Sequence, residues 1–330
     1  MRDLTIRFED TDLKGTFLKY HPDFFIEILK RKYNVIVLTE GKEEPDVLFF
    51  SCFGMNNVKW TKCLRIFFSA ESGFPDYNMC DYAIGLTNIG KTERFFHLPL
   101  YVFYNNLLQK YENLAPVKDD ELFNREFCSI VVSNTWRNPI LFEFFDHLKE
   151  YKPIASGGKW RNNIGRCVYD KLDFISNYKF NIAFENMKVD GYVTEKIFEP
   201  FVARTIPIYW GSGYIKKELG EGSYIDISDF DSIDGVIEYI KKIDNDKNLY
   251  LQMLNNKINV PYSYENWCDQ LLNFLVTAIE NDSRIFNTMT NRTYEEKLHF
   301  HRVHKGYIGK LYRAHMGLYR SVRHFITTHL

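Results

Sequence analysis

One stretch, Tyr178–Ser212, constrains the fold of this chain more than any other. An apolar run at Phe180–Phe184 gives way to a polar loop, then to a segment that opens around Thr194, and then to a second apolar run at Ile206–Trp210. Strand, loop, helix and strand in that order form a βαβ unit of a parallel sheet. Its polar residues fall in the loop after a strand and in the first turn of a helix, where such units bind ligands.

The same alternation runs through most of the chain. Further short apolar runs predict strands or extended pieces at Leu4–Phe8, Val35–Leu38, Val47–Phe50, Leu64–Phe68, Asp81–Leu86, His97–Phe103, Cys128–Val132 and Tyr224–Ile227. Apolar residues at helical spacing predict helices at Phe24–Lys32, Ile140–Leu148, Ile233–Ile243, Asn248–Asn256 and Gln270–Ile279. The strand runs are nearly continuous in apolar residues, which is typical of strands buried on both faces of a parallel sheet.

A chain of 330 residues is long for one core and fits two domains. The polar segment Leu114–Glu121, which contains Pro116, is the best candidate boundary. We therefore predict an α/β protein with two Rossmann-like domains that face a cleft, one at residues 1–118 and one at residues 119–282. Residues 283–330 are set apart as a basic and aromatic C-terminal segment.

Composition excludes several classes of protein. The net charge is −1, so the whole chain carries no signal for nucleic-acid binding. No apolar run is long enough to span a bilayer, and the first residues, MRDLTIRFEDTD, do not resemble a signal peptide, so we expect a cytoplasmic protein. The six cysteines include no CxxC pair, which favours free thiols and disfavours a zinc site.

The last residues are the one strongly biased segment. From Lys297 to Leu330 there are seven Lys or Arg residues and six of the nine His residues, but no Asp or Glu. A basic amphipathic helix binds anionic lipid surfaces, so this segment could attach the protein peripherally to the inner membrane. The alternative is an ordinary C-terminal helix that packs back on the first domain, and the sequence leaves both open.

The segment around Thr194 can bind an anion. If Thr194 caps the helix, Glu195 and Lys196 lie in its first turn, where backbone N–H groups and the helix dipole favour negative charge. Lys196 suits a phosphate oxygen, whereas Glu195 is better placed to bind sugar hydroxyls or to stabilise positive charge at a reacting carbon. An ordinary helix start with a solvated lysine is the alternative. Pro200 lies inside this predicted helix and is expected to kink it or shift its start.

Other strand ends carry further candidates. Glu71 follows the apolar strand Leu64–Phe68, where a carboxylate can act as a general base, although a solvated loop acid is the alternative. Arg137, Lys159 and Arg161 follow turns at which pyrophosphate often binds. No GxGxxG or Walker A pattern occurs, and the two DxD patterns lie beside predicted helix starts, which favours capping over metal binding.

Four blocks of this sequence resemble the family 10 α-1,3/4-fucosyltransferases. The longest, FNIAFENMKVDGYVTEKIFEPFVARTIPIYWGS, is similar to the donor-binding motif of that family, and SAESGFPDYNMCDYAIGL resembles the block around its catalytic glutamate. FCSIVVSN and YKPIASGGKWRNNIG resemble the opening of the donor domain and the glycine-rich loop after it. The likeness runs from about Leu64 to Asn281 and is greatest to bacterial members that add Lewis-type fucose to lipopolysaccharide.

The resemblance implies a GT-B fold and an inverting transfer of L-fucose from GDP-β-L-fucose to a lactosamine or lactose-type glycan, with an acceptor domain first and a donor domain second. Glu71 matches the general base, and Glu195 matches the carboxylate that contacts fucose. The resemblance implies donor contacts from Ser133, Asn134, Arg137, Asn186, Tyr192 and Lys196. No cofactor is required by this chemistry, and a stimulating divalent cation is left open.

The chain departs from the family at one place. Similar enzymes carry a diphosphate-binding arginine in the helix after Ser133-Asn134, but the helix PILFEFFDHL has none, and Arg137 comes earlier. Two other functions also stay open at this point: a non-catalytic protein that binds a glycan or a nucleotide, and a transferase for another sugar nucleotide. Whether the new bond would be α-1,3 or α-1,4 is not readable from the loops.

Overall fold

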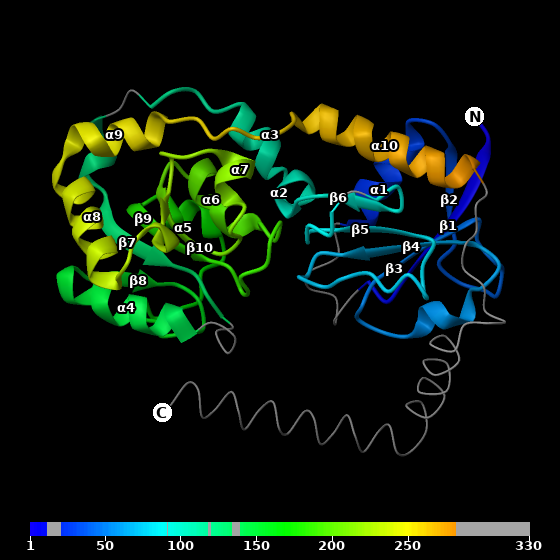
Figure 1. Cartoon of the computed structure of the whole chain (residues 1–330), viewed down its shortest axis with the longest axis horizontal. Helices are drawn as coiled ribbons and strands as arrows, with labels where there is room; N and C mark the ends of the chain where they lie inside the picture. The colour runs from blue at the N-terminus through cyan, green and yellow to red at the C-terminus, as the bar shows by residue number, and fades with distance from the viewer. Residues whose placement is uncertain (12–20, 91, 118–119, 134–138, 282–330) are drawn as a thin grey trace, which may run out of the picture. The chain divides into compact units, whose positions relative to one another are not determined.

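The computed structural model describes residues 1–11, 21–90, 92–117, 120–133 and 139–281. The chain forms two compact units (Figure 1). The first joins Met1–Leu98 to the chain that begins at Tyr264, and the second is Pro99–Ser263. Each unit contains one parallel sheet, which confirms the predicted α/β class with two Rossmann-like domains.

The first unit is built on a six-stranded sheet with the order β2-β1-β3-β4-β5-β6. Its strands are β1 (Asp3–Glu9), β2 (Asn34–Val37), β3 (Val47–Phe50), β4 (Leu64–Ser69), β5 (Tyr82–Gly85) and β6 (Phe95–His97). All neighbours are parallel. The central strands β3, β4 and β5 are buried along their whole length, as their continuous apolar sequence predicts.

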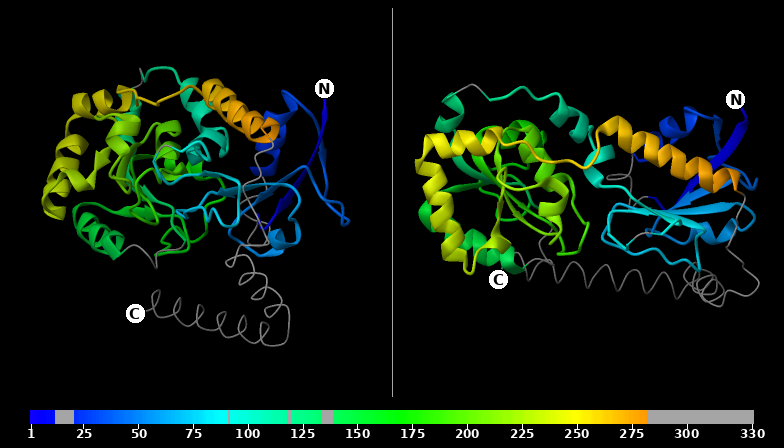
Figure 2. Two further views of the ribbon diagram at one scale, coloured as in Figure 1. Left: turned by 45° about the vertical axis from the view of Figure 1, so that its right-hand side comes forward. Right: turned by 45° about the horizontal axis from the view of Figure 1, so that its top comes forward.

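The helices of the first unit are α1 (His21–Lys30), α10 (Tyr264–Glu280) and the 3₁₀ turn η1 (Asn56–Lys59). Helix α1 packs Phe25 between the rings of Phe49 and Phe68, with centroid distances of 5.2 and 4.9 Å. Both views of Figure 2 show α10, in orange, running along this unit, with Phe274 in contact with Tyr82. A segment distant in sequence therefore completes the first core.

The second unit is built on a five-stranded parallel sheet with the order β11-β10-β9-β7-β8. Its strands are β7 (Glu126–Ile130), β8 (Ile154–Ser156), β9 (Tyr178–Phe184), β10 (Ile206–Trp210) and β11 (Ile225–Asp226). Numbered within the unit, this order is 2-1-3-4-5, so the direction of winding reverses between β7 and β9. Ligands of doubly wound folds bind outside the carboxyl ends of the strands at such a switch point.

The helices of the second unit pack on its sheet and on one another. They are α2 (Leu100–Phe103), α3 (Leu107–Glu112), α4 (Pro139–Tyr151), α5 (Lys171–Ile175), α6 (Glu195–Val202), α7 (Ile215–Leu219), α8 (Ile233–Asn245) and α9 (Lys247–Asn255), with 3₁₀ turns η2 (Asp120–Asn124) and η3 (Ile227–Asp229). Helix α8 illustrates how the sequence forms such a helix. Ser232 caps it, and apolar residues such as Val236, Ile240 and Ile243 face the core.

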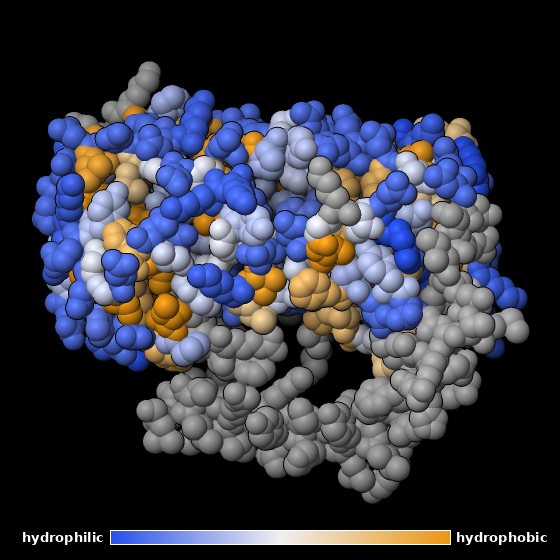
Figure 3. Space-filling model, viewed as in Figure 1, coloured by the Kyte–Doolittle hydropathy of each residue, from blue (hydrophilic) through white to orange (hydrophobic). Residues whose placement is uncertain are grey.

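Polar side chains dominate the molecular face in Figure 3, as expected outside such cores.

The structure differs from the sequence prediction in three details. Val35–Leu38 corresponds to the edge strand β2 rather than a buried strand, and Ile36 is 40% exposed. The predicted extended piece His97–Phe103 is wrong for its second half, which forms α2. The predicted ranges 1–118 and 119–282 also differ from the two units, because α2 and α3 pack on α6 and α10 packs on the first unit.

Candidate functional site

The switch point of the second sheet is marked by polar residues after β7 and β9. Ser133 follows β7, is exposed, and its Oγ accepts a hydrogen bond from the Lys159 backbone N–H at 3.3 Å. Glu185 and Asn186 follow β9 directly; Glu185 is fully buried and Asn186 is exposed. Each side of the switch point therefore has one exposed candidate ligand residue, Ser133 after β7 and Asn186 after β9.

The start of α6 has the predicted cap. The Thr194 Oγ1 accepts a hydrogen bond from the Lys196 backbone N–H at 3.3 Å, so Glu195 and Lys196 lie in the first helical turn. Pro200 does not break the helix, which runs on to Val202. The donor end of an eight-residue helix thus meets the carboxyl edge of the sheet with a lysine beside it.

Glu185 ties the strand end to this cap. Its Oε1 accepts a hydrogen bond from the Thr194 backbone N–H at 2.8 Å, and its Oε2 accepts one from the Thr194 Oγ1 at 2.7 Å. The ammonium of Lys196 lies 3.5 Å from the Glu185 Oε2 and 3.3 Å from the Glu195 Oε1. One half-buried lysine is therefore shared by two buried carboxyl groups.

These groups perturb one another's ionisation. Burial raises the pKa of Glu185 to about 7, against the opposing charge of Lys196. Burial also acts to raise the pKa of Glu195, but the neighbouring Lys196 and Lys171 charges outweigh it and hold that pKa below its ordinary value. The two carboxylates in turn outweigh the burial of Lys196 and raise its pKa. Lys196 is thus a fixed cation and Glu195 a fixed anion, whereas Glu185 titrates near neutrality.

A second layer of charge lies one helical turn further along α6. Glu199 is 4% exposed and forms an ion pair with Lys171 at the start of α5. Tyr104 lies near both Glu195 and Glu199, and burial together with these carboxylates raises the pKa of its hydroxyl. Sequence reasoning did not identify Glu185, Lys171 or Glu199. Of the three, only Glu185 had a visible signal, because it directly follows a buried strand.

The loop between β9 and α6 is fixed by glycine geometry and backbone contacts. Gly191 has a φ of +78°, a conformation that other residues seldom adopt, and its N–H donates to the Ser212 Oγ at 3.0 Å. Tyr192 follows and is 2% exposed. Of the two predicted donor contacts in this loop, Asn186 is therefore on the surface and Tyr192 is in the interior.

The candidate base lies in the first unit. Glu71 is exposed in the loop after β4, and its backbone N–H donates to the Ser69 Oγ at 3.1 Å. This places Glu71 beyond the carboxyl end of a parallel strand, as predicted. Phe74, three residues further on, is 65% exposed in the same loop.

The remaining predicted residues have different outcomes. Asn134, Arg137 and residues 297–330 lie outside the described residues. Arg161 pairs with Asp146 on α4, whereas Lys159 is exposed beside Ser133. In the DxD pattern Asp244-Asn245-Asp246, Asp246 caps α9 as expected, but Asp244 is a buried ion-pair partner.

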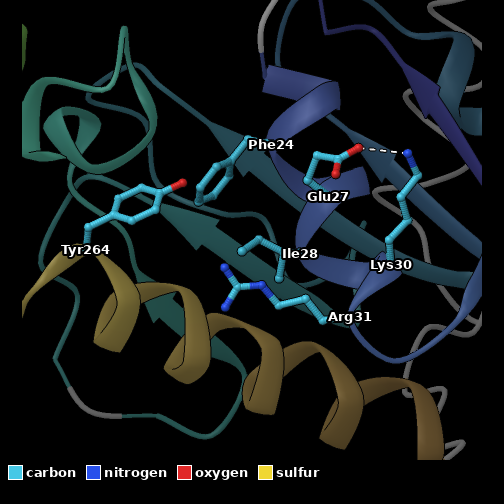
Figure 4. Close-up of a pocket in the computed structure, with 6 residues that line it drawn as sticks. All are labelled: Phe24, Glu27, Ile28, Lys30, Arg31 and Tyr264. Carbon is cyan, nitrogen blue, oxygen red and sulfur yellow. Dashed lines mark hydrogen bonds and ion pairs between the residues drawn. The ribbon is translucent and has the colours of Figure 1, made fainter.

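Elsewhere in the part of the chain that the structure describes, metal-binding side chains and thiols do not form a second candidate site. There, no three His, Cys, Asp or Glu side chains lie close enough to hold a metal ion. All six cysteines are free, and four are buried. A hollow between α1 and α10, lined by Phe24, Arg31 and Tyr264 among others, contains none of the predicted site residues (Figure 4).

Comparison with known proteins covers both units. A family model described as glycosyltransferase family 10 (fucosyltransferase), C-terminal part, matches residues 124–285. A second, for the N-terminal domain of the α-(1,3)-fucosyltransferase FucT, matches residues 6–104.

Curated relatives agree. The chain is 33% identical to the Helicobacter pylori α-(1,3)-fucosyltransferase FucT in an alignment of length 297 that covers 78% of this chain and 62% of that protein. It is 39% identical to the Drosophila melanogaster α-(1,3)-fucosyltransferase B over 107 residues, or 32% of this chain and 24% of the relative. The chain thus spans less than two thirds of the length of these relatives.

Solved structures match along nearly the whole of their chains. A crystal structure of an α1,3-fucosyltransferase with GDP-fucose superposes with a TM-score of 0.73 at 30% identity, covering 87% of this chain and 94% of that one. The structure of an α1,3-fucosyltransferase with GDP gives a TM-score of 0.71 at the same identity, covering 86% and 92%.

Proposed function

Because the chain belongs to glycosyltransferase family 10, the fucosyltransferases, we propose that it transfers L-fucose from GDP-β-L-fucose to a hydroxyl of a lactosamine or lactose-type glycan. The observation that carries the proposal is the first turn of α6. There a capped helix N-terminus and Lys196 lie at the switch point of a Rossmann-like unit, beside the buried Glu195. The two parallel-sheet units are of the GT-B type.

The donor diphosphate would bind at this helix start. Backbone N–H groups and the Lys196 ammonium stabilise the negative charge that builds up on GDP as it leaves. Family resemblance adds Asn186, Tyr192 and Ser133 as donor contacts, and extends the same role to Asn134 and Arg137. Lys159 is an exposed cation beside Ser133 and is a further candidate partner for a phosphate oxygen.

Transfer would proceed with inversion in a single displacement. The fucosyl carbon becomes oxocarbenium-like in the transition state, as in glycoside hydrolysis, and the ionised Glu195 stabilises that positive charge. Glu71 would take the proton from the attacking acceptor hydroxyl as general base. The exposed loop after β4 leaves this carboxylate accessible to a substrate.

The acceptor and the cellular setting rest on the resemblance alone. The resemblance to bacterial members that add Lewis-type fucose to lipopolysaccharide favours an α-1,3 linkage to GlcNAc or glucose in lipopolysaccharide or O-antigen synthesis. The described residues contain no helix long and apolar enough to cross a membrane. Peripheral contact through residues 297–330 stays a proposal, and liposome binding should fall when residues 317–330 are deleted if it is correct.

The test is release of GDP from GDP-fucose in the presence of N-acetyllactosamine or lactose, with the product linkage assigned by NMR. We expect turnover that depends on acceptor. GDP binding without turnover on any such acceptor would instead support a non-catalytic binding protein, and turnover of another sugar nucleotide would assign a different donor.

Glu71→Gln provides the mechanistic prediction. The variant should keep its fold and its affinity for GDP-fucose but lose transfer by a factor on the order of 10² to 10⁴, because the amide cannot accept the proton. The exposed acid Glu43, which lies in the turn before β3, supplies the matched control, and Glu43→Gln should transfer at the wild-type rate. Full activity in Glu71→Gln would exclude Glu71 as the base.

A further inference from the structure

Glu185 is a fully buried carboxyl group to which the proposed mechanism gives no role. It stands between β9 and α6 and receives both polar hydrogens of Thr194, at 2.8 and 2.7 Å. Because Thr194 caps α6 and Lys196 is two residues away, Glu185 fixes where the helix starts and where the lysine lies.

The packing leaves this side chain little freedom to move. Its backbone N–H donates to the Trp210 carbonyl at 2.8 Å, and a methyl group added at Gly211 would come within 2.6 Å of the Glu185 Cγ. The carboxyl group is therefore held in place against β10. Its response to a change in nearby charge is to change its protonation state rather than its position.

Titratable groups from three neighbouring elements face it. Lys196 and Glu195 approach from α6, Tyr209 from β10, and the half-buried Glu218 from α7. The Lys196 ammonium lies 3.5 Å from the Glu185 Oε2, and Glu195 shares this cation. An anionic ligand on Lys196 would add negative charge beside a group that already has two carboxyl neighbours, which favours the neutral form of Glu185.

We propose, on the basis of the donor-binding role set out above, that Glu185 is a positioning residue that holds Thr194 and Lys196 for the diphosphate and binds a proton from solvent when the diphosphate engages Lys196. The carboxylate and the incoming proton form a carboxylic acid, and no other bond changes. In the protonated state the Oε2–H donates to the Thr194 Oγ1 along the same 2.7 Å contact. The link between β9 and the cap therefore survives in both states.

Calorimetric titration of the full chain with GDP-fucose, without acceptor, measures the proton directly. In two buffers of different ionisation enthalpy at about pH 7.5, wild-type protein should take up a fraction of one proton per donor bound. Glu185→Gln, an uncharged mimic of the protonated side chain, should bind the donor with no uptake. Glu218→Gln is the matched control, since the half-buried Glu218 also has its pKa raised to about 7, but its buried Oε2 has no hydrogen-bond partner and so does not hold Thr194 or Lys196. This variant should retain the uptake.

The pH dependence of the affinity for GDP-fucose is a second measurement, and a purely structural role of Glu185 would not change it. Wild-type affinity for GDP-fucose should fall as pH rises above about 7, by at most tenfold per pH unit for one linked proton. The affinity of Glu185→Gln should be independent of pH over the same range. Glu185→Ala, which cannot bond to Thr194, should lose affinity at every pH, and the Gln variant should restore it.

The outcomes separate the two proposals. Failure of wild-type protein to bind GDP-fucose would overturn the proposed function. Binding without proton uptake, or uptake that persists in Glu185→Gln, would overturn the role of Glu185 alone. If Glu185→Gln does not fold, as judged by near-UV circular dichroism, Glu185→Asp takes its place, and an uptake midpoint identical to wild type in that variant would count against Glu185.

Discussion

Asp244 lies near the end of α8 with a fully buried side chain, and three groups from other elements converge on it. The Lys152 Nζ lies 2.5 Å from its Oδ2, the Tyr151 hydroxyl donates to Oδ2 at 2.8 Å, and Lys179 pairs with Oδ1. Burial acts to raise the pKa of Asp244, but the hydrogen bonds from the two lysines outweigh it and hold the pKa below its ordinary value. Asp244 thus fastens α8 to α4 and β9.

Asp244→Asn should destabilise the second unit by on the order of 3 kcal/mol, because it leaves the buried Lys179 without its counter-ion. The pKa in the fold is lowered, so the ion pair contributes fully above the unfolded pKa of about 4 and is lost as pH falls. Urea unfolding at about pH 7 and about pH 3 should show the gap between wild type and variant closing at the acid end. Asp234→Asn, whose side chain is 86% exposed on the same helix, should change stability by less than about 0.5 kcal/mol.

Gly211→Ala tests the close packing around Glu185. The added methyl group would come within 2.3 Å of the Tyr209 hydroxyl and 2.6 Å of the Glu185 Cγ, so we expect a loss of about 1–3 kcal/mol and weaker donor binding. Gly213→Ala meets its nearest neighbour at 3.4 Å and serves as the control. Equal melting temperatures for the two variants would contradict this account of Gly211.

At the scale of single residues, sequence predicts local chemistry better than tertiary chemistry. The Thr194 cap follows from local spacing, and the structure confirms it. The roles of Asp244 and Lys179 depend on partners more than 60 residues apart in the chain, so no local pattern announces them. Asp244 was expected to serve helix capping because Asp is common at helix boundaries, but its neighbour Asp246 does that.

Among the elements, α10 best illustrates how a helix is held to a core. Its buried face includes Trp267, Leu271 and Leu275. Its polar face offers Glu265 and Asp269 to Arg31, the residue that directly follows α1, each at 3.2 Å. The apolar contacts are shielded from water, whereas all three charged partners are at least 36% exposed. Burial rather than ion pairing should therefore supply most of the docking free energy.

Leu275→Ala and Arg31→Ala separate these two contributions. The first should cost about 2–5 kcal/mol because it opens a cavity under the helix. The second should cost no more than about 1 kcal/mol, since exposed ion pairs are weak. Guanidinium unfolding of both variants measures the difference, and a larger loss in Arg31→Ala would show that the ion pairs dominate.

Element types were predictable from sequence where apolar periodicity was strong, as in β9, α6 and β10. Prediction failed where tertiary packing sets the outcome. The apolar sequence from Leu98 to Phe103 reads equally well as a strand, but Tyr101 stacks on Phe198 of α6 at 3.9 Å and the segment forms α2. Short elements such as β8 and α5 have too few residues to show a period.

For the molecule as a whole, two separate cores predict two unfolding transitions. In differential scanning calorimetry, GDP should raise the melting temperature of one transition only. At a hundredfold excess over its Kd, bound GDP stabilises that unit by about 2.7 kcal/mol. Leu275→Ala should lower the other transition, and Ile208→Ala, in the buried strand β10, should lower the one that GDP raises. A single transition, or equal shifts of both with GDP, would show that the units unfold as one.

The route of the chain through the two units also sets an order of events during synthesis. In the part of the chain that the structure describes, the second unit is the stretch from Pro99 to Ser263, which has been translated before α10 begins. The first unit starts the chain but lacks α10 until Glu280 has left the ribosome. The nascent protein therefore carries an N-terminal sheet with an uncovered apolar side throughout the synthesis of its neighbour, and that interval is when chaperones would engage it.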